Sequence, residues 1–194
     1  NKRVKPNFQM FWSEQIPKIN VKDSLGITSS VELISGKFEG IKSLEAPPNS
    51  WANDSNNYFA VWIINLKSKG SFVIPKTFKG INRSIYISKD TNIQVNNDLI
   101  ASHSMIELFS DQKAILKNNI GDATILMLQG RPINEPIESY GPFVMNTRSE
   151  IQEAFYDYNR TKFGGWRWPN SDPIHGPYKG RFAKLNNGKI DKPG

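Results

Sequence analysis

Short runs of β-branched and aromatic residues, separated by polar connections, constrain the fold of this chain more than any other feature. The longest run, residues 58–66 (YFAVWIINL), is too short to span a membrane as a helix and is rich in strand-favouring residues. Its continuous apolar character is typical of a strand that is buried on both faces. Further strand-like runs occupy residues 31–36, 71–75, 83–88, 91–95, 104–109, 114–116 and 123–130.

The connections between these runs are short and rich in Gly, Asn, Asp and Ser. Closely spaced short strands with such connections are typical of antiparallel sheets, whereas parallel sheets need a helical crossover between strands. The sequence therefore predicts an all-β fold, as a barrel or a sandwich. We expect Trp62, Phe72 and Tyr86 to belong to its core.

The pattern changes after the last strand-like run. Residues 131–137 contain two prolines and are expected to be extended. Thr147 and Glu150 then form a Thr-x-x-Glu capping box, which predicts a helix start. One apolar face follows at helical spacing, made of Ile151, Ala154, Phe155 and Tyr158. The glycines at 164–165 are expected to end the helix.

The formal net charge of +7 is concentrated at the two ends of the chain. Residues 1–5 and 160–194 are strongly basic, whereas residues 6–159 carry nearly balanced charge. This distribution is typical of solvated basic ends around a neutral domain. We therefore expect no nucleic-acid partner.

The inventory of reactive side chains is small. The chain has no cysteine, which excludes disulfides, thiolate metal sites and cysteine nucleophiles. It has two histidines, His103 and His175, each expected in a loop or at a strand end without chemistry. No serine has a nucleophile-elbow pattern around it, and no apolar run reaches membrane-spanning length. No basic-then-apolar signal segment opens the chain, so a cytoplasmic location without membrane contact is expected.

Two segments of the second half resemble a known family. Residues 128–137 (LQGRPINEPI) are similar to the GxPLxEP segment of pirin-like proteins, and residues 139–147 (SYGPFVMNT) to their HGPFVMNT segment. Upstream, residues 33–36 with Gly40 resemble a strand of the family, and residues 5–9 resemble the linker into its second half. Tyr140 departs from the family, which usually has histidine there.

The resemblance implies a cupin fold, a double-stranded β-helix or jelly-roll barrel, with one C-terminal α-helix and an irregular tail. Pirin-like proteins contain two such barrels in tandem, and the resemblance places this chain in the second. The expected organisation is a linker at 1–22, a cupin barrel at 23–130, an extended segment and capping helix at 131–165, and an irregular basic tail at 166–194.

The resemblance assigns the family's metal site, three histidines and one glutamate, to the first barrel. The matching positions here would be Lys76, Phe78 and Asn82, none of them suitable, with His103 alone on a later segment. We therefore expect no catalytic residue, cofactor or metal in this chain. Iron or another divalent metal is expected only in the N-terminal barrel.

The candidate functional residues lie in the family motif and just beyond the helix. The motif residues, expected at an interface with the other barrel or a second copy, are Gly141, Pro142, Phe143, Val144, Met145, Asn146 and Thr147. Trp166 and Trp168 flank an arginine and are candidate contacts for a protein partner. An apolar interface at residues 141–158 would make the chain a dimer or join it to its other half.

Three functions remain open from the sequence. The leading interpretation is a noncatalytic cupin domain that supports or regulates a metal-bearing barrel and provides a binding surface. A second is a fragment of a metal-dependent quercetin 2,3-dioxygenase. The third is a transcription cofactor-like module that binds other proteins. Fold analogy alone does not choose among them.

Overall fold

The computed structural model describes residues 4, 7, 9–87, 92–165, 180–185 and 187–194. Two compact units divide the chain. The first consists mainly of Arg3–Pro132 with Ala183–Gly194, and the second of Ile133–Phe182. The candidate residues Trp166 and Trp168, together with His175, lie outside the described residues.

The first unit is built on a six-stranded antiparallel sheet with the order β1-β2-β5-β12-β7-β10. Its strands are β1 (Lys18–Lys22), β2 (Thr28–Ser35), β5 (Ala60–Leu66), β12 (Ala123–Gly130), β7 (Asn82–Ile87) and β10 (Met105–Glu107). β5 is central and pairs with both β2 and β12. Its residues alternate between buried and half-buried, which explains why every residue of the strand except Asn65 is apolar.

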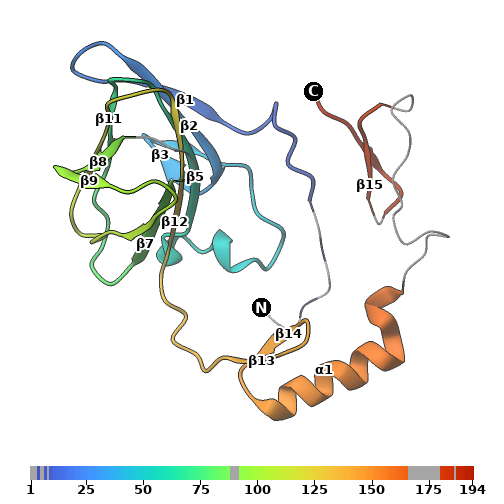
Figure 1. Ribbon diagram of the computed structural model, residues 1–194. Helices are drawn as coiled ribbons and strands as arrows, with labels where there is room; N and C mark the ends of the chain where they lie inside the picture. Colours follow the sequence, from blue (N-terminus) through green and yellow to red (C-terminus); the bar gives the residue numbers. More distant parts are fainter. Residues whose placement is uncertain (1–3, 5–6, 8, 88–91, 166–179, 186) are drawn as a thin grey trace. The chain divides into compact units, whose positions relative to one another are not determined.

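A second antiparallel sheet faces the first, with the order β6-β11-β8-β9. Its strands are β6 (Ser71–Ile74), β11 (Ala114–Asn118), β8 (Ile93–Val95) and β9 (Asp98–Ile100), and Figure 1 shows β8 and β11 opposite β5 and β12. A two-stranded ribbon, β3 (Lys37–Phe38) with β4 (Ile41–Lys42), follows β2. Two 3₁₀ turns, η1 (Trp51–Asn53) and η2 (Ser55–Asn57), precede β5.

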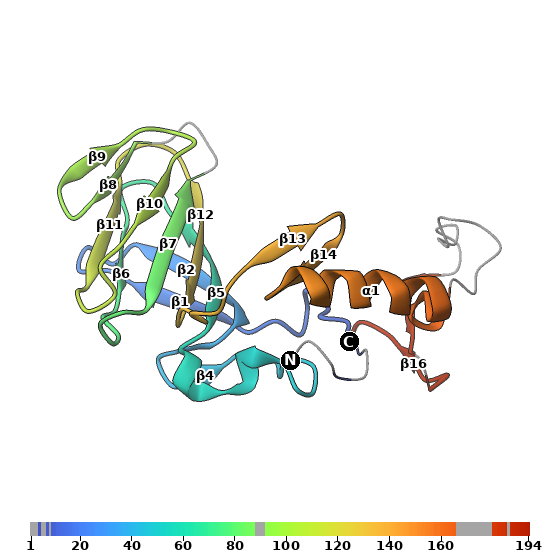
Figure 2. The ribbon, with the colours of Figure 1, turned by 90° about the horizontal axis from the view of Figure 1, so that it is seen from below.

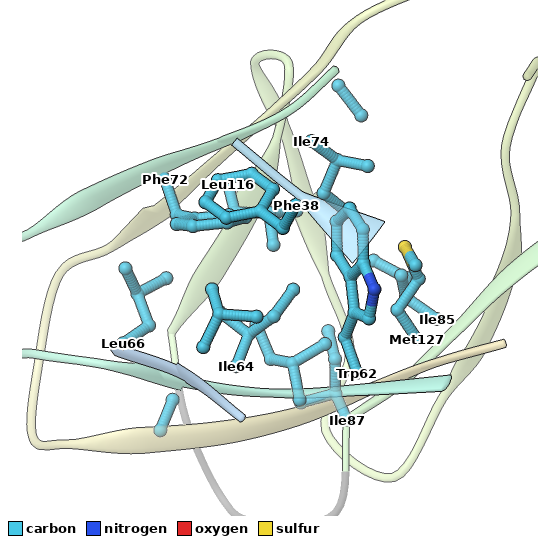
Figure 3. Packing of buried hydrophobic residues seen from close by; sticks show 14 of the residues in the cluster. Phe38, Trp62, Ile64, Leu66, Phe72, Ile74, Ile85, Ile87, Leu116 and Met127 are labelled. Atoms are coloured by element: carbon cyan, nitrogen blue, oxygen red, sulfur yellow. The ribbon is translucent and has the colours of Figure 1, made fainter. Parts of the chain in front are cut away.

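The core lies between the two sheets (Figure 3). Phe38 packs edge-on against Trp62, with ring centroids 5.1 Å apart, and lies 5.6 Å from Phe72. Trp62 and Phe72 are buried, as predicted, but the prediction for Tyr86 is wrong because strand alternation turns its side chain outward. Fully buried members of the cluster include Val31, Leu33, Ile64, Leu66, Ile74, Ile85, Ile93, Leu116, Ile125 and Met127.

A β-bulge distorts the pairing of β2 with β5 between Leu33 and Ser35. Gly36 follows it with φ +93, and a Cβ at this position would lie 2.7 Å from the carbonyl oxygen of Phe59. Only glycine fits this backbone conformation and this close approach.

The second unit is a hairpin and a helix. β13 (Glu138–Tyr140) pairs with β14 (Phe143–Met145), and α1 (Arg148–Thr161) follows. Figure 2 shows the hairpin beside α1. The predicted capping box is present, with the Thr147 side chain accepting from the Glu150 N–H and the Glu150 carboxylate accepting from the Thr147 N–H at 3.0 Å.

The α-helix ends earlier than its glycines indicate. Lys162 is already in the left-handed conformation (φ 49, ψ 24) and caps α1, and a 3₁₀ turn, η3 (Lys162–Gly164), follows. The predicted stop at 164–165 therefore marks the end of the 3₁₀ turn instead of the α-helix.

Strands also occur where the sequence indicated linker and tail. β1 lies within the segment expected as linker, because it adds an edge to the six-stranded sheet. β15 (Ala183–Lys184) and β16 (Ile190–Asp191) pair within the expected irregular tail. The tail is tied to the first unit, since Trp12 Nε1 donates to Asp191 Oδ2 at 3.3 Å.

Candidate functional site

The inward-facing positions of the barrel are largely apolar. On β5 they are Ala60, Trp62, Ile64 and Leu66, and on β12 they are Ala123, Ile125 and Met127. Each is buried. These side chains fill the space in which a cupin metal site would gather imidazoles and carboxylates.

The positions aligned with metal ligands point elsewhere. Lys76, Phe78 and Asn82 are all exposed. His103 is exposed in a turn before β10, with φ 57, so it is a loop residue. No group of three or more His, Cys, Asp or Glu among the described residues is placed to hold a metal ion.

A polar network lies at the end of the barrel where β5 begins. Arg83 is 4% exposed and its Nε donates to Gln129 Oε1 at 2.7 Å across β7 and β12. Gln129 Nε2 donates in turn to the carbonyl oxygen of Tyr58 at 2.8 Å. Burial lowers the pKa of the Arg83 guanidinium from its ordinary value, because desolvation disfavours the charged form.

Aromatic rings and a second arginine lie beside this network. Tyr58 has left-handed backbone angles (φ 49, ψ 31), and its ring lies 4.7 Å from that of Phe78. Arg131 places its guanidinium carbon 5.7 Å from the Tyr58 ring centroid and donates from Nε to the carbonyl oxygen of Asn56. This end of the barrel therefore combines two cations with two aromatic faces.

The sequence analysis did not single out this network. A signal was present, since Arg83 shares the alternation phase of Ile85 and Ile87, both buried. An arginine at an inward position of an otherwise apolar strand is unusual, because a buried charge is costly unless it is paired.

The family motif at 141–147 divides between two structural roles. Phe143 packs on the helix, with its ring centroid 4.8 Å from that of Phe155. A Cβ on Gly141, which has φ +56, would lie 3.5 Å from Phe155 Cζ, so the tight turn brings the backbone against the same ring. Asn146 donates from its side chain to Glu135 Oε2 at 2.6 Å, and Thr147 caps α1.

The rest of the motif faces outward. Pro142 is exposed, and Met145 is half-buried. Val144 is 61% exposed and stands opposite Ser139 in the hairpin. Ile137, which is 80% exposed, lies just before β13, so Ile137 and Val144 are two exposed apolar side chains at the hairpin. We call this pair the hairpin outer face.

Taken together, the first unit is a two-sheeted antiparallel barrel of the cupin class, followed by a hairpin and a capped helix. Comparison with known proteins agrees with this class. The family described as "Pirin C-terminal cupin domain" matches residues 61–164, and the chain belongs to the pirin family.

The similar proteins are longer than this chain. Pirin from Rattus norvegicus is 32% identical over 84% of the chain and 53% of its own length. A pirin-like protein from Solanum lycopersicum is 27% identical over 84% of this chain and 53% of its own length. A solved structure of quercetin 2,3-dioxygenase from Acinetobacter baumannii superposes with a TM-score of 0.67 at 28% identity, covering 82% of this chain and 51% of that one. The chain thus spans about half the length of the relatives it matches.

Among the helices within the described ranges, none is both long and apolar enough to cross a membrane.

Proposed function

We propose that the chain is a noncatalytic cupin domain that supports or regulates a second, metal-bearing cupin barrel and docks on it through the hairpin outer face. The observation that carries the first part is the packing of the barrel interior. Its inward positions hold Trp62, Ile64, Ile125 and Met127 in place of metal ligands. A barrel filled in this way has a structural or binding role and no metal-dependent chemistry of its own.

Two findings support the docking part. The relatives contain about as much chain again as this sequence covers, which leaves room for a second domain. The hairpin outer face exposes Ile137 and Val144 in the unit that contains the capped helix α1. Neighbouring exposed apolar side chains are typical of an interface, because their burial in a complex is favourable.

A second candidate function follows from the structural comparison. The A. baumannii relative at 28% identity is a quercetin 2,3-dioxygenase, so the whole protein could oxidise a flavonol at a metal held by its other barrel. Under this alternative the present chain is again the half without ligands. The two functions differ in what the full-length protein does and agree on the properties of this domain.

Metal loading tests the noncatalytic part. The purified chain is stripped with a chelator, offered Fe(II), Mn(II) or Ni(II), desalted and measured by elemental mass spectrometry. We expect metal far below one equivalent, and no consumption of quercetin by the loaded chain. One tightly held equivalent would overturn the proposal and make His103 or His175 a ligand.

Light scattering across a wide range of protein concentration tests the docking part. The isolated chain should self-associate through the hairpin outer face, a second copy taking the place of the other barrel. Ile137→Ser and Val144→Ser together should shift the equilibrium to monomer. The control Leu99→Ser changes a side chain on β9 whose exposure (63%) is close to that of Val144 (61%), and it should leave association unchanged. A monodisperse monomer at all concentrations would contradict docking through this face.

A further inference from the structure

An exposed aromatic ring lies beside Tyr58 at the end of the barrel where β5 begins. Phe78 is 61% exposed, in the connection between β6 and β7, and its ring contacts that of Tyr58. The backbone is fixed there, because Ser110 Oγ donates to the carbonyl oxygen of Phe78 and the Thr77 N–H donates to that of Ser110, each at 2.7 Å. Phe109, next to Ser110, is 78% exposed. Two large apolar side chains therefore reach solvent from loops that are bonded to each other.

Arg131 is held beside these rings with one edge of its guanidinium unused. Its backbone N–H donates to the carbonyl oxygen of Asn57 and its Nε to that of Asn56, both at 2.8 Å. The guanidinium carbon lies over the Tyr58 ring. The side chain is exposed, and within the described residues neither Nη1 nor Nη2 has a hydrogen-bond partner. A guanidinium fixed in this way is preorganised to bind a carboxylate through its terminal N–H groups.

The surface around these side chains is positively charged. Lys76 and Lys79 are exposed on either side of Phe78 in the sequence, and residues 75–81 include no carboxylate. Neither lysine forms an ion pair in the part of the chain that the structure describes, and the same is true of Arg131. Unpaired cations around an exposed ring are complementary to a partner that combines negative charge with an apolar side chain.

The other charges in the loops at this end of the barrel do not cancel the excess. Asp54 already accepts a backbone N–H of its own turn through Oδ1 at 2.9 Å. The loop between β10 and β11 carries one charge of each sign, Asp111 and Lys113. The buried Arg83 adds a further positive charge, since its partner in the polar network is a neutral amide. A negatively charged partner is therefore favoured at this end.

We propose that this surface binds a segment of a partner protein in which carboxylates lie next to an aromatic side chain. We call the surface the Phe78 face, and it consists of Tyr58, Lys76, Phe78, Lys79 and Arg131. One carboxylate of the partner would bind the terminal N–H groups of Arg131, and the aromatic ring would pack on Phe78. The face belongs to the first unit, so the inference does not depend on the hairpin outer face or on the proposed function.

Exposed rings and cations also occur in proteins that bind single-stranded nucleic acids. Such proteins stack successive bases on free ring faces along a positively charged groove. Here the Tyr58 ring already contacts both Arg131 and Phe78, so it offers little free surface to a base. Three exposed cations would also meet few phosphates, whereas phosphate contacts supply most of the affinity for nucleic acids. An acidic peptide with an aromatic anchor fits the Phe78 face better.

Fluorescence anisotropy with a fluorescein-labelled peptide of sequence DEDFDED tests the proposal at low ionic strength. We expect saturable binding to the chain, binding of DEDADED that is at least about fivefold weaker, and no binding of KKKFKKK. The first comparison isolates the ring contact, and the second isolates the charge. A labelled oligothymidylate should bind more weakly than DEDFDED. Failure of DEDFDED to bind, equal binding of DEDADED, or tighter binding of the oligothymidylate would overturn the proposal.

Substitutions in the chain locate the binding. Arg131→Gln removes the charge that meets the carboxylate, and Phe78→Ser removes the exposed ring. Each should weaken DEDFDED binding at least about fivefold. Lys76→Gln together with Lys79→Gln should weaken it about threefold and reduce its dependence on salt, because exposed charges contribute less.

Each variant has a matched control elsewhere on the first unit. Leu99→Ser changes a side chain whose exposure (63%) is close to that of Phe78 (61%). Lys22→Gln together with Lys117→Gln removes two exposed lysine charges from strand positions. Both controls should bind DEDFDED within about twofold of the parent chain. Circular dichroism establishes that each variant is folded, and the Arg131 variant decides alone if Phe78→Ser unfolds. Equal losses in the controls and in the variants of the Phe78 face would overturn the proposal.

Discussion

The ring of Phe143 meets the ring of Phe155 edge-on, with centroids 4.8 Å apart and planes at 83°. Tyr158 and Phe163 lie 6.2 and 6.0 Å from Phe143 on the same side. The family motif therefore supplies the central residue of a small aromatic cluster that joins the hairpin to the helix. Its neighbour Val144 points the other way, so one short strand serves both packing and the proposed interface.

Phe143→Ala should detach the hairpin from α1. The site is half-buried, so we expect a loss of about 2 kcal/mol, roughly half the cost of emptying a fully buried phenylalanine site. Amide hydrogen exchange of residues 138–145 should become about 30-fold faster. Val144→Ala, at an exposed position, should change exchange little. Equal effects of the two substitutions would contradict the assigned roles.

Thr147→Ala should fray the first turn of α1. It removes the acceptor for the Glu150 N–H and leaves only one half of the capping box. A cap of this kind contributes about 1 kcal/mol, so exchange in residues 148–151 should rise about fivefold. Gln152→Ala changes an exposed side chain one turn later and is the control. Protection that is unchanged in Thr147→Ala would show that the hairpin alone holds the helix start.

Gly36→Ala should be among the most harmful single substitutions in the first unit. A left-handed non-glycine residue costs about 1–2 kcal/mol, and the close approach to Phe59 adds about 1–3 kcal/mol of overpacking. Gly40→Ala has a similar φ of +81 with open space around its Cβ, so it should show the first cost only. The midpoint of urea denaturation measures the stability of each variant, and Gly36→Ala should unfold at less urea than Gly40→Ala. Equal midpoints for the two variants would mean that the Phe59 carbonyl moves aside.

Asp23→Asn should destabilise the barrel in a pH-dependent way. Desolvation raises the pKa of Asp23, but hydrogen bonds from the backbone N–H groups of Ile27, Ser71 and Leu25 outweigh it and lower the pKa below 3.8. A depressed folded pKa contributes stability that is present above 3.8 and lost as the pH falls through the folded value. Asparagine has one acceptor oxygen where the carboxylate has two, so it cannot accept from both Leu25 and Ser71.

Thermal unfolding as a function of pH measures this effect. At neutral pH the melting temperature of Asp23→Asn should lie below that of the parent chain. The difference in melting temperature should narrow once the pH falls below 3.8. Asp98→Asn, an exposed carboxylate on β9, is the control. A melting difference that stays constant down to acid pH would contradict the role of the ionised carboxylate.

Much of the fold could be predicted because its signals are local. The capping box at Thr147 and Glu150 is a four-residue pattern, and its geometry is as predicted. The apolar run at 58–66 predicted a strand buried on both faces, and β5 is an interior strand of the larger sheet with one face buried and the other half-buried. Both features depend on side chains within a few residues of one another.

The predictions from the sequence were incomplete or wrong where the structure of a segment depends on how it pairs or packs with other parts of the chain. The residues of β1 alternate between polar and apolar (KINVK), which is a strand pattern, but only the structure shows that β1 pairs with β2 at the edge of the sheet. Tyr86 is exposed because the phase of β7 is set by Ile85 and Ile87. The helix ends at Thr161 because Lys162 turns left-handed, whereas sequence reasoning relied on the glycines that follow.

For the candidate sites too, some features could be predicted from the sequence and others required the strand pairing. The motif at 141–147 was visible as a resemblance, but its separation into an inward Phe143 and an outward Val144 required the β13–β14 pairing. Tyr58, Phe78 and Arg131 are remote in sequence and become neighbours only in the folded barrel.

The sequence by itself determined the class of fold, the strand-forming runs, the capped helix and the membership of a family, since each is encoded in local pattern and composition. Tertiary structure alone decided which polar groups are enclosed, because burial and hydrogen-bond satisfaction are properties of how three strands and their neighbours pack. The burial of the Arg83 guanidinium is one outcome of that packing, because it depends on how β7, β12 and their neighbours come together.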